Sequence, residues 1–329
     1  MRRFFLLLIL AAVIAGVAYW VVAPFGPSSE KFVDIAPGTP SRHIAAQLEQ
    51  NGIIRSKYLF DAMHAIKGGT LKAGEYRFDH PLKMSDVYGR LQRGEVYTVS
   101  VTIPEGSNLF DIAQRIQNAG LGSKESFLTA AHANVKLIAD IDPNATTLEG
   151  YLFPDTYHFS RHMTPLQMQE AMVRRFRQVA AQLGLSGDDH RIVTLASLVE
   201  RETPIPDERP LVASVFVNRM AKGMPLMTDP SVIYAALLAG RYRGTIYASD
   251  LQSDSPYNTY KHPGLPPGPI CSPGAASLKA AMHPAQTDYL YFVAASANPS
   301  GKSRFSATLE QHAHDVAAYR KSLHQASSR

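Results

Sequence analysis

The chain has 329 residues, of which 45% are hydrophobic and 19% charged, and its formal net charge is +5. This length favours two or three subdomains over a single core. The basic residues are scattered along the chain, which predicts no nucleic-acid partner. Its one cysteine, Cys271, excludes an internal disulfide, and no Cys/His set has zinc spacing.

The most metal-like cluster consists of His312, His314 and Asp315. Two residues that are two positions apart on a helix point to different sides, so we interpret the three as surface residues. The sequence therefore predicts neither a metal site nor a cofactor.

An apolar run from Phe4 to Ala23 follows the basic residues Arg2 and Arg3. As a helix it would rise about 30 Å, the thickness of a hydrocarbon core. The basic flank predicts residues 1–3 to be a cytoplasmic tail and the bulk of the chain to be exported. A cleaved signal peptide is the alternative, but this run is longer than the usual apolar core. We therefore expect a retained transmembrane helix over 4–23 and a linker over 24–31.

Two stretches of the N-terminal half repeat each other. Val33–Thr39 reads VDIAPGT, and Val101–Ser107 reads VTIPEGS. An Ile-Ala pair, a glycine and Ser-Lys follow each copy, which predicts a strand, a glycine turn and two helices. Repeats are expected over 32–96 and 97–161, ahead of a third domain over 162–329. A duplicated scaffold explains the pattern as well as glycan binding does, although the units are similar to LysM modules, which hold N-acetyl sugars.

Each copy ends in an aromatic stretch. AGEYRF at 73–78 predicts a return strand, and its counterpart is LEGYLFPDTY at 148–157. The second stretch holds two carboxylates, Glu149 and Asp155. Most such residues belong to a core or a turn, so both remain secondary candidates for a site.

The C-terminal half is mainly helical by its periodicity. Helices are expected over 164–183, 191–203, 208–222, 229–239, 272–282 and 308–323. Thr164 and Pro165 form a capped start, and Gly184 an end, for the first of them. A strand is expected over 288–295 and another at Phe305. The predicted fold class is α+β.

The helix over 191–203 ends in two carboxylates, Glu200 and Glu202. They lie about 200° apart around the helix, so at most one of them faces a given cleft. Glu202 falls in the last turn, whose free carbonyls, with partial burial, would raise a carboxyl pKa toward that of a general acid. Helix geometry alone does not choose between the two.

The segment from Asp250 to Pro273 is rich in turns, and an irregular segment of this length is often functional. It carries Tyr257, Asn258, Thr259 and Tyr260, whose polar tips and flat faces suit sugar rings. A disordered linker is the alternative. The prolines are interleaved with aromatic residues rather than with Ser, Gly and charge, which favours an ordered segment.

Several catalytic motifs are absent. The sequence has no G-x-S-x-G elbow, S-x-x-K with K-T-G, P-loop, Rossmann glycine motif or H-E-x-x-H. The catalyst left by this exclusion is a carboxylate in a cleft lined by Tyr and Asn. Such a site is typical of glycosidic-bond cleavage.

The chain resembles the YceG-like family of endolytic murein transglycosylases from about Val33 to the C-terminal helix. The motifs that carry the resemblance are AGEYRF (73–78), EGYLFPDTY (149–157), ASLVERET (196–203), ASVFVNRM (213–220), TDPSVIY (228–234), SPYNTY (255–260), GLPPGPICSPG (264–274), SLKAAMHP (277–284) and YLYFVA (289–294). The family motif Glu-Lys-Glu-Thr reads Glu-Arg-Glu-Thr here, with Arg201 retaining the charge.

The resemblance implies residue roles. The second glutamate of the motif is the family's essential carboxylate, which maps onto Glu202 and leaves Glu200 as a neighbour. The expected substrate-binding residues within the motifs are Asn218, Asp229, Tyr257, Asn258, Thr259 and Tyr260. The resemblance also implies LysM-like α/β structure ahead of a catalytic domain over 162–329.

The resemblance further implies a place and a reaction. We expect a single-pass protein of the bacterial inner membrane that acts outside the cytoplasm on nascent peptidoglycan strands, beside peptidoglycan synthases of the elongation machinery. One carboxylate would cleave the MurNAc-β-1,4-GlcNAc bond and leave 1,6-anhydro ends, without metal or cofactor. The alternatives are a non-catalytic peptidoglycan-binding scaffold and a hydrolytic muramidase that uses Glu149 or Asp155 as its base.

Overall fold

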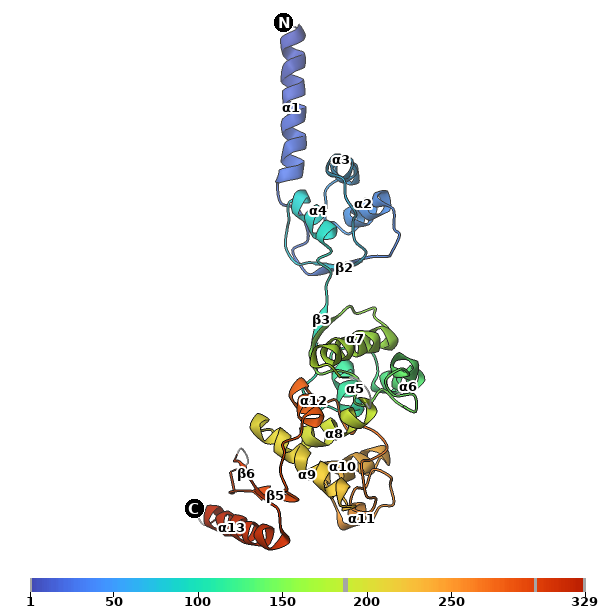
Figure 1. The fold of residues 1–329 in the computed structure, drawn as a ribbon. Helices are drawn as coiled ribbons and strands as arrows, with labels where there is room; N and C mark the ends of the chain where they lie inside the picture. The colour runs from blue at the N-terminus through green and yellow to red at the C-terminus, as the bar shows by residue number, and fades with distance from the viewer. Residues whose placement is uncertain (1, 186–188, 299–300, 328–329) are drawn as a thin grey trace. The chain divides into compact units, whose positions relative to one another are not determined.

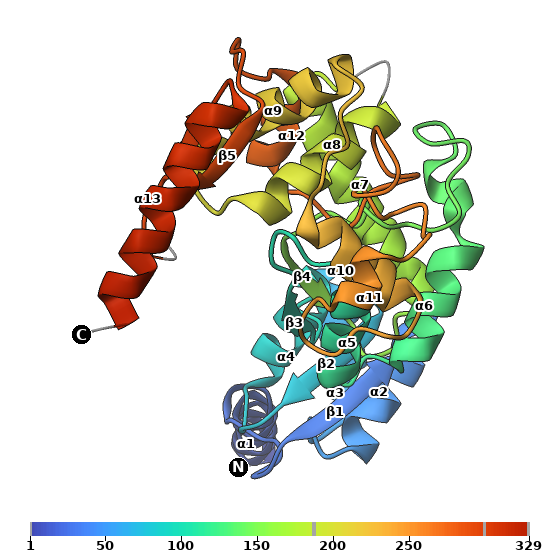
Figure 2. The same cartoon turned by 90° about the horizontal axis from the view of Figure 1, so that it is seen from below.

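The computed structural model describes residues 2–185, 189–298 and 301–327, which divide into two compact units, Met1–Val99 and Ser100–Arg329. Figures 1 and 2 show that both units consist of helices together with short two-stranded sheets. The mixed α+β class is therefore confirmed. The second predicted repeat lies in the same compact unit as the predicted domain over 162–329.

The first unit begins with helix α1 (Arg2–Val22), where the apolar run predicts a helix. Among the described residues, no helix is long and apolar enough to span a bilayer. The membrane anchor is not confirmed and stays a prediction.

The rest of the first unit follows the predicted repeat. Its elements are β1 (Lys31–Ile35), α2 (Ser41–Gln50), α3 (Lys57–Lys67), β2 (Gly74–Phe78) and α4 (Met84–Arg93). Strands β1 and β2 pair antiparallel. Their alternating buried residues, such as Val33 and Tyr76, share one core with Leu48, Phe60 and Leu91 of the helices.

The second unit opens with the same element order. It comprises β3 (Val99–Thr102), α5 (Leu109–Asn118), α6 (Lys124–Ala133), the 3₁₀ helix η1 (Val135–Ile138) and β4 (Thr156–Phe159), and β3 pairs with β4. In both copies the first strand pairs with the last across two helices. This agrees with the sequence repeat, whereas the likeness to LysM modules stays a prediction.

Helices then dominate the second unit. They are α7 (Pro165–Leu183), α8 (Asp189–Glu202), η2 (Pro206–Glu208), α9 (Arg209–Ala221), α10 (Asp229–Leu238), α11 (Ala248–Leu251), α12 (Ala275–Met282) and α13 (Leu309–Ser327), with a strand pair β5 (Tyr291–Ala294) and β6 (Ser303–Ser306). Helix α7 starts with a Thr164–Gln167 capping box and Pro165, as its sequence predicts. Helix α12 packs against α8 and α9, and α13 runs along β5 (Figure 2).

Two predicted boundaries are wrong. Helix α12 starts at Ala275 rather than at Ser272, because the backbone of Ser272 is bonded to Ser107 in a loop. Strand β5 covers only Tyr291–Ala294, since its partner β6 is equally short.

Gly150 lies in the aromatic stretch that ends the second repeat, in a conformation and a space that suit glycine. Its φ is +86°, and a Cβ there would lie 2.4 Å from Cβ of Pro269. We expect Gly150→Ala to lower the free energy of unfolding by about 2–4 kcal/mol, measured in urea, because left-handed strain and overlap add. Gly184 has a φ of +72° but open space around it. Gly184→Ala should therefore lower the free energy of unfolding by only about 1 kcal/mol. Equal losses in the two variants would contradict an overlap between a Cβ at position 150 and Pro269.

Candidate active site

Helix α8 ends at Glu202 because of the residues that follow. The hydroxyl of Thr203 donates to Oε2 of Glu208 at 3.2 Å and accepts the N–H of Ile205 at 3.1 Å. Pro204 disfavours helical geometry at the preceding residue. Glu202 is therefore fixed on the last turn, as the sequence predicts.

The two carboxylates of α8 have opposite surroundings. Glu200 has a side chain only 5% exposed. Its Oε1 accepts from Nη2 of Arg209 at 3.1 Å, and its Oε2 accepts the N–H of Gly274 at 3.0 Å. Glu202, on the other side of the helix, lines a cavity. The prediction that the two point to different sides is confirmed, and both oxygens of Glu200 are already committed to the protein.

The Glu202 cavity has a volume of about 310 Å³. Helix α9, the start of α10, strand β5 and helix α13 all contribute to it. Its lining consists of Glu202, Phe216, Arg219, Leu226, Met227, Asp229, Tyr260, Tyr291, Phe292 and His312. Aromatic side chains form much of this wall, so the cavity offers flat apolar surface around the carboxyl groups of Glu202 and Asp229.

Burial is the main influence on the pKa of the Glu202 carboxyl. It raises the pKa of this carboxyl to about 7, with a further contribution from the negative charge of Asp229. Arg201 and the hydroxyl of Thr228 act in the opposite direction. Glu202 is thus partly protonated at neutral pH, as a general acid requires.

Two of the predicted binding residues join Glu202 in this cavity. Tyr260 donates its hydroxyl hydrogen to Oδ1 of Asp229 at 2.6 Å. Next to them, Met227 has a φ of +55°, a left-handed conformation that is rare for a residue with a side chain. Its N–H donates to the carbonyl of Thr259. Strain of this kind is concentrated at functional sites.

The sequence analysis missed one wall of the cavity. Nη1 of Arg219 donates to the carbonyl of Leu226 at 2.8 Å, and its guanidinium lies 5.5 Å from the ring centre of Tyr291. The ring of His312 stacks on Tyr291 at 5.1 Å. Arg219 and Tyr291 belong to the motifs ASVFVNRM and YLYFVA quoted above. Their membership of these motifs was the signal in the sequence that could have identified them as site residues.

The interpretation of His312 as a surface residue is wrong. Helix α13 packs along β5 and carries this ring into the cavity, where burial lowers its pKa. His314 is 83% exposed, as the interpretation requires. Among the described residues, no group of three or more His, Cys, Asp or Glu could hold a metal ion.

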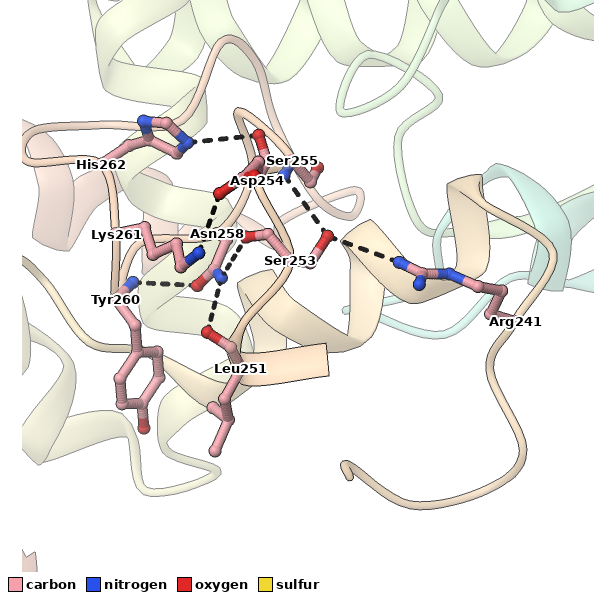
Figure 3. Close-up of polar contacts among 9 residues, drawn as sticks. All are labelled: Arg241, Leu251, Ser253, Asp254, Ser255, Asn258, Tyr260, Lys261 and His262. Carbon is pink, nitrogen blue, oxygen red and sulfur yellow. Dashed lines mark hydrogen bonds and ion pairs between the residues drawn. The ribbon is translucent and has the colours of Figure 1, made fainter. Parts of the chain in front are cut away.

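Asn258 and Thr259 organise the irregular segment from within, and Figure 3 shows the contacts of Asn258. Nδ2 of Asn258 donates to the carbonyls of Leu251 and Ser253 at 3.0 and 2.7 Å, and its Oδ1 accepts the N–H of Tyr260. Oγ1 of Thr259 accepts the N–H of Thr228 at 3.0 Å. Both side chains are fully buried. They fix the segment that presents Tyr260 and do not line the cavity themselves.

The remaining predicted residues lie apart from Glu202. Nδ2 of Asn218 donates to two backbone carbonyls just before β5. Tyr257 and Glu149 line a different cavity. Asp155 is paired with Arg175 at 2.6 Å. None of these four predicted residues lines the Glu202 cavity.

Comparisons with known proteins agree with the motifs. Residues 33–318 match the YceG-like family. An endolytic murein transglycosylase of Bacillus subtilis is 34% identical over 301 residues, covering 85% of this chain and 82% of that protein. One from Streptococcus pneumoniae serotype 2 (strain D39) is 29% identical, and the match covers 90% of this chain and 60% of that protein.

A solved structure is also similar. The crystal structure of a yceG-like protein from Listeria monocytogenes is 32% identical, with a TM-score of 0.57, and the match covers 88% of this chain and 99% of that chain. The resemblance seen in the motifs is confirmed by matches that extend over most of the chain. The chain therefore belongs to the YceG-like family of endolytic murein transglycosylases.

Proposed function

We propose that this chain cleaves the β-1,4 bond between N-acetylmuramic acid and N-acetylglucosamine inside nascent peptidoglycan strands, leaving 1,6-anhydro ends. The observation that carries the proposal is Glu202, a carboxyl group with a pKa of about 7 in a cavity lined by aromatic side chains. Its neighbour Asp229 is already bonded to Tyr260. The cavity thus offers one carboxyl group free to exchange a proton with a substrate.

The reaction needs only that group. Protonated Glu202 donates to the bridging oxygen as the bond to C1 of the muramyl unit breaks. The resulting carboxylate then removes the proton from the muramyl C6 hydroxyl, whose oxygen bonds to C1. No water enters, and Glu202 ends the cycle protonated. Because the sugar supplies its own nucleophile, one carboxylate serves where a hydrolase ordinarily uses two.

The place of action is part of the same proposal. An apolar N-terminal helix over 4–23 would hold the chain at the outer face of the bacterial inner membrane, where new strands emerge. There it would end glycan elongation beside peptidoglycan synthases, and the two repeats would contact the glycan. Cleavage there would release a nascent glycan strand by cutting it at an internal bond.

Product analysis tests the chemistry. Purified full-length protein is incubated with uncrosslinked glycan, and the products are weighed by mass spectrometry. We expect anhydro ends, one water lighter than reducing ends. Reducing ends would support the hydrolytic muramidase instead, and pull-down of glycan without any products would support the binding scaffold.

One observation favours the muramidase as the second candidate. Asp229 shares the cavity with Glu202, and although its Oδ1 accepts from Tyr260, its other carboxyl oxygen could orient a water. Glu149 and Asp155, the bases suggested by the sequence, do not line this cavity. The mass difference of one water separates the two reactions whichever carboxylate assists.

The pH dependence follows from the raised pKa of Glu202. The free enzyme must carry the proton, so kcat/KM should be level below about pH 7 and fall tenfold per pH unit above it. Initial rates of strand cleavage between pH 5 and 9 measure this profile. A rate that rises steadily up to pH 9 would contradict a protonated carboxyl as the acid.

A further inference from the structure

The second unit contains another cavity, larger than that of Glu202, with a volume of about 500 Å³. The loop 141–147, the first turn of α8 and the irregular segment form it. It shares no lining residue with the Glu202 cavity. The proposed reaction does not use it, although Glu149 of the EGYLFPDTY motif lies in its wall.

Glu149, a residue of that wall, has one side-chain oxygen without a hydrogen-bond partner. Its side chain is 3% exposed. Oε2 accepts the N–H of Leu109 at 2.9 Å and the hydroxyl of Tyr234 at 3.0 Å, whereas Oε1 has no partner among the described residues. Burial raises the pKa of this carboxyl to about 8, so at neutral pH it can donate a hydrogen bond. A buried donor without an acceptor is costly, which points to a missing ligand group.

His190 supplies the complementary group. Its Nδ1 lies 2.8 Å from Oδ2 of Asp142, a side chain 6% exposed. A carboxylate accepts, so Nδ1 is the nitrogen that donates to Asp142, and in the neutral form of the ring Nε2 is then an acceptor. The hydroxyl of Tyr151 also donates to Asp142 and helps to hold that carboxylate in place.

The rest of the wall is apolar or negative. Tyr257, Pro267 and Pro269 provide flat apolar surface, and the ring of Tyr257 packs against Tyr234 at 5.0 Å. Within the part of the chain that the structure describes, no Lys or Arg lines the cavity, whereas Asp142 and Asp189 do. A ligand with carboxylates, such as a peptide stem, is therefore disfavoured by charge.

We propose that this cavity is a second glycan-binding site that recognises the 2-acetamido group of an N-acetylhexosamine. The acetamido N–H would donate to Nε2 of His190, its carbonyl would accept from Glu149, and its methyl group would contact Tyr257. The proposal takes a glycan as ligand from the proposed function and adds a separate place to hold it.

The irregular segment joins the two cavities. Tyr257 lies in the wall of this one, and Tyr260 donates to Asp229 in the other. Asn258 and Thr259 between them are buried and bonded on several sides. A sugar unit bound here is thus held by the segment that shapes the Glu202 cavity, which would keep a long strand in place during an internal cut.

The test follows the ring proton of His190 by NMR in the full chain carrying Glu202→Gln, so that nothing is cleaved. The resonance is assigned by its loss in His190→Ala. We expect triacetylchitotriose to shift it, and cellotriose, which lacks acetamido groups, to leave it in place. Thr146→Trp, at the exposed rim of the cavity, should raise the half-saturating concentration at least tenfold. Thr70→Trp, an equally exposed change in the first unit, should not.

Equal shifts with both sugars, no shift at all, or a larger shift with an unlinked stem peptide would each overturn the proposal. Unfolding of Thr146→Trp is checked by its melting temperature, and loss of acetamide-dependent chemical shifts at Tyr257 in His190→Ala serves as the second measurement. Failure of the proposed function is separate, because it appears as absent anhydro products from wild-type protein while the NMR titration is unaffected.

Discussion

Replacing Glu202 with Gln is expected to lower the rate of strand cleavage by about 10²- to 10⁴-fold, the usual contribution of a general acid–base group. Gln keeps the size and polarity of the side chain but neither gives up nor takes a proton at the required step. The loss should lie in kcat, because the aromatic wall that binds the sugar is unchanged. Release of anhydro-muropeptides over time, quantified by mass spectrometry, measures it.

A matched control separates chemistry from charge. Glu125→Gln makes the same substitution at an exposed position of α6. It should leave the rate within about twofold of wild type, since surface changes of this kind alter stability by only about 0.5 kcal/mol. Wild-type release of anhydro products by Glu202→Gln would remove Glu202 from the mechanism.

Glu202→Gln should also be more stable than the wild-type protein above neutral pH. The folded pKa of Glu202, about 7, is raised above the unfolded value, so the folded state binds this proton more tightly. The corresponding stability is present below about pH 4.5 and is lost as pH rises through about 7. Glu202→Gln removes that loss, which amounts to no more than about 3 kcal/mol. Such a gain alongside inactivity is typical of a residue kept for function.

Replacing Glu200 with Ala is expected to destabilise the fold by about 3–5 kcal/mol, the cost of leaving a buried charge without its partner. Arg209 is 8% exposed, and its next carboxylate, Glu105, lies 3.6 Å away on an exposed side chain. The substitution also removes the acceptor of the Gly274 N–H. Equilibrium unfolding in urea at pH 7 measures the change.

A double variant checks the cause. Glu200→Leu combined with Arg209→Met removes both charges and leaves apolar side chains of similar size. It should recover part of the loss, because burying two charges has its own desolvation cost. Wild-type stability of Glu200→Ala would contradict the buried pair, and a double variant less stable than both singles would contradict the charge argument.

Local signals were sufficient for most of the fold. The capping box of Thr164 and Gln167, Pro165 and Gly184 delimit α7 as expected, and Thr203-Pro204 ends α8 at Glu202. Such signals act between residues a few positions apart, so the sequence displays them directly. The same holds for the 200° between Glu200 and Glu202, which follows from helix geometry alone.

The sequence by itself therefore determined the helices, the repeated strand–helix–helix–strand order, the family and Glu202 as the candidate catalyst. Only the tertiary structure decided which side chains surround Glu202. Arg219 and His312 reach it from helices nearly a hundred residues apart. Asn258 and Glu149 are equally suitable residue types, but Asn258 bonds the backbone of its own segment and Glu149 accepts the N–H of Leu109. Burial and partners depend on packing between distant elements, and no local pattern encodes them.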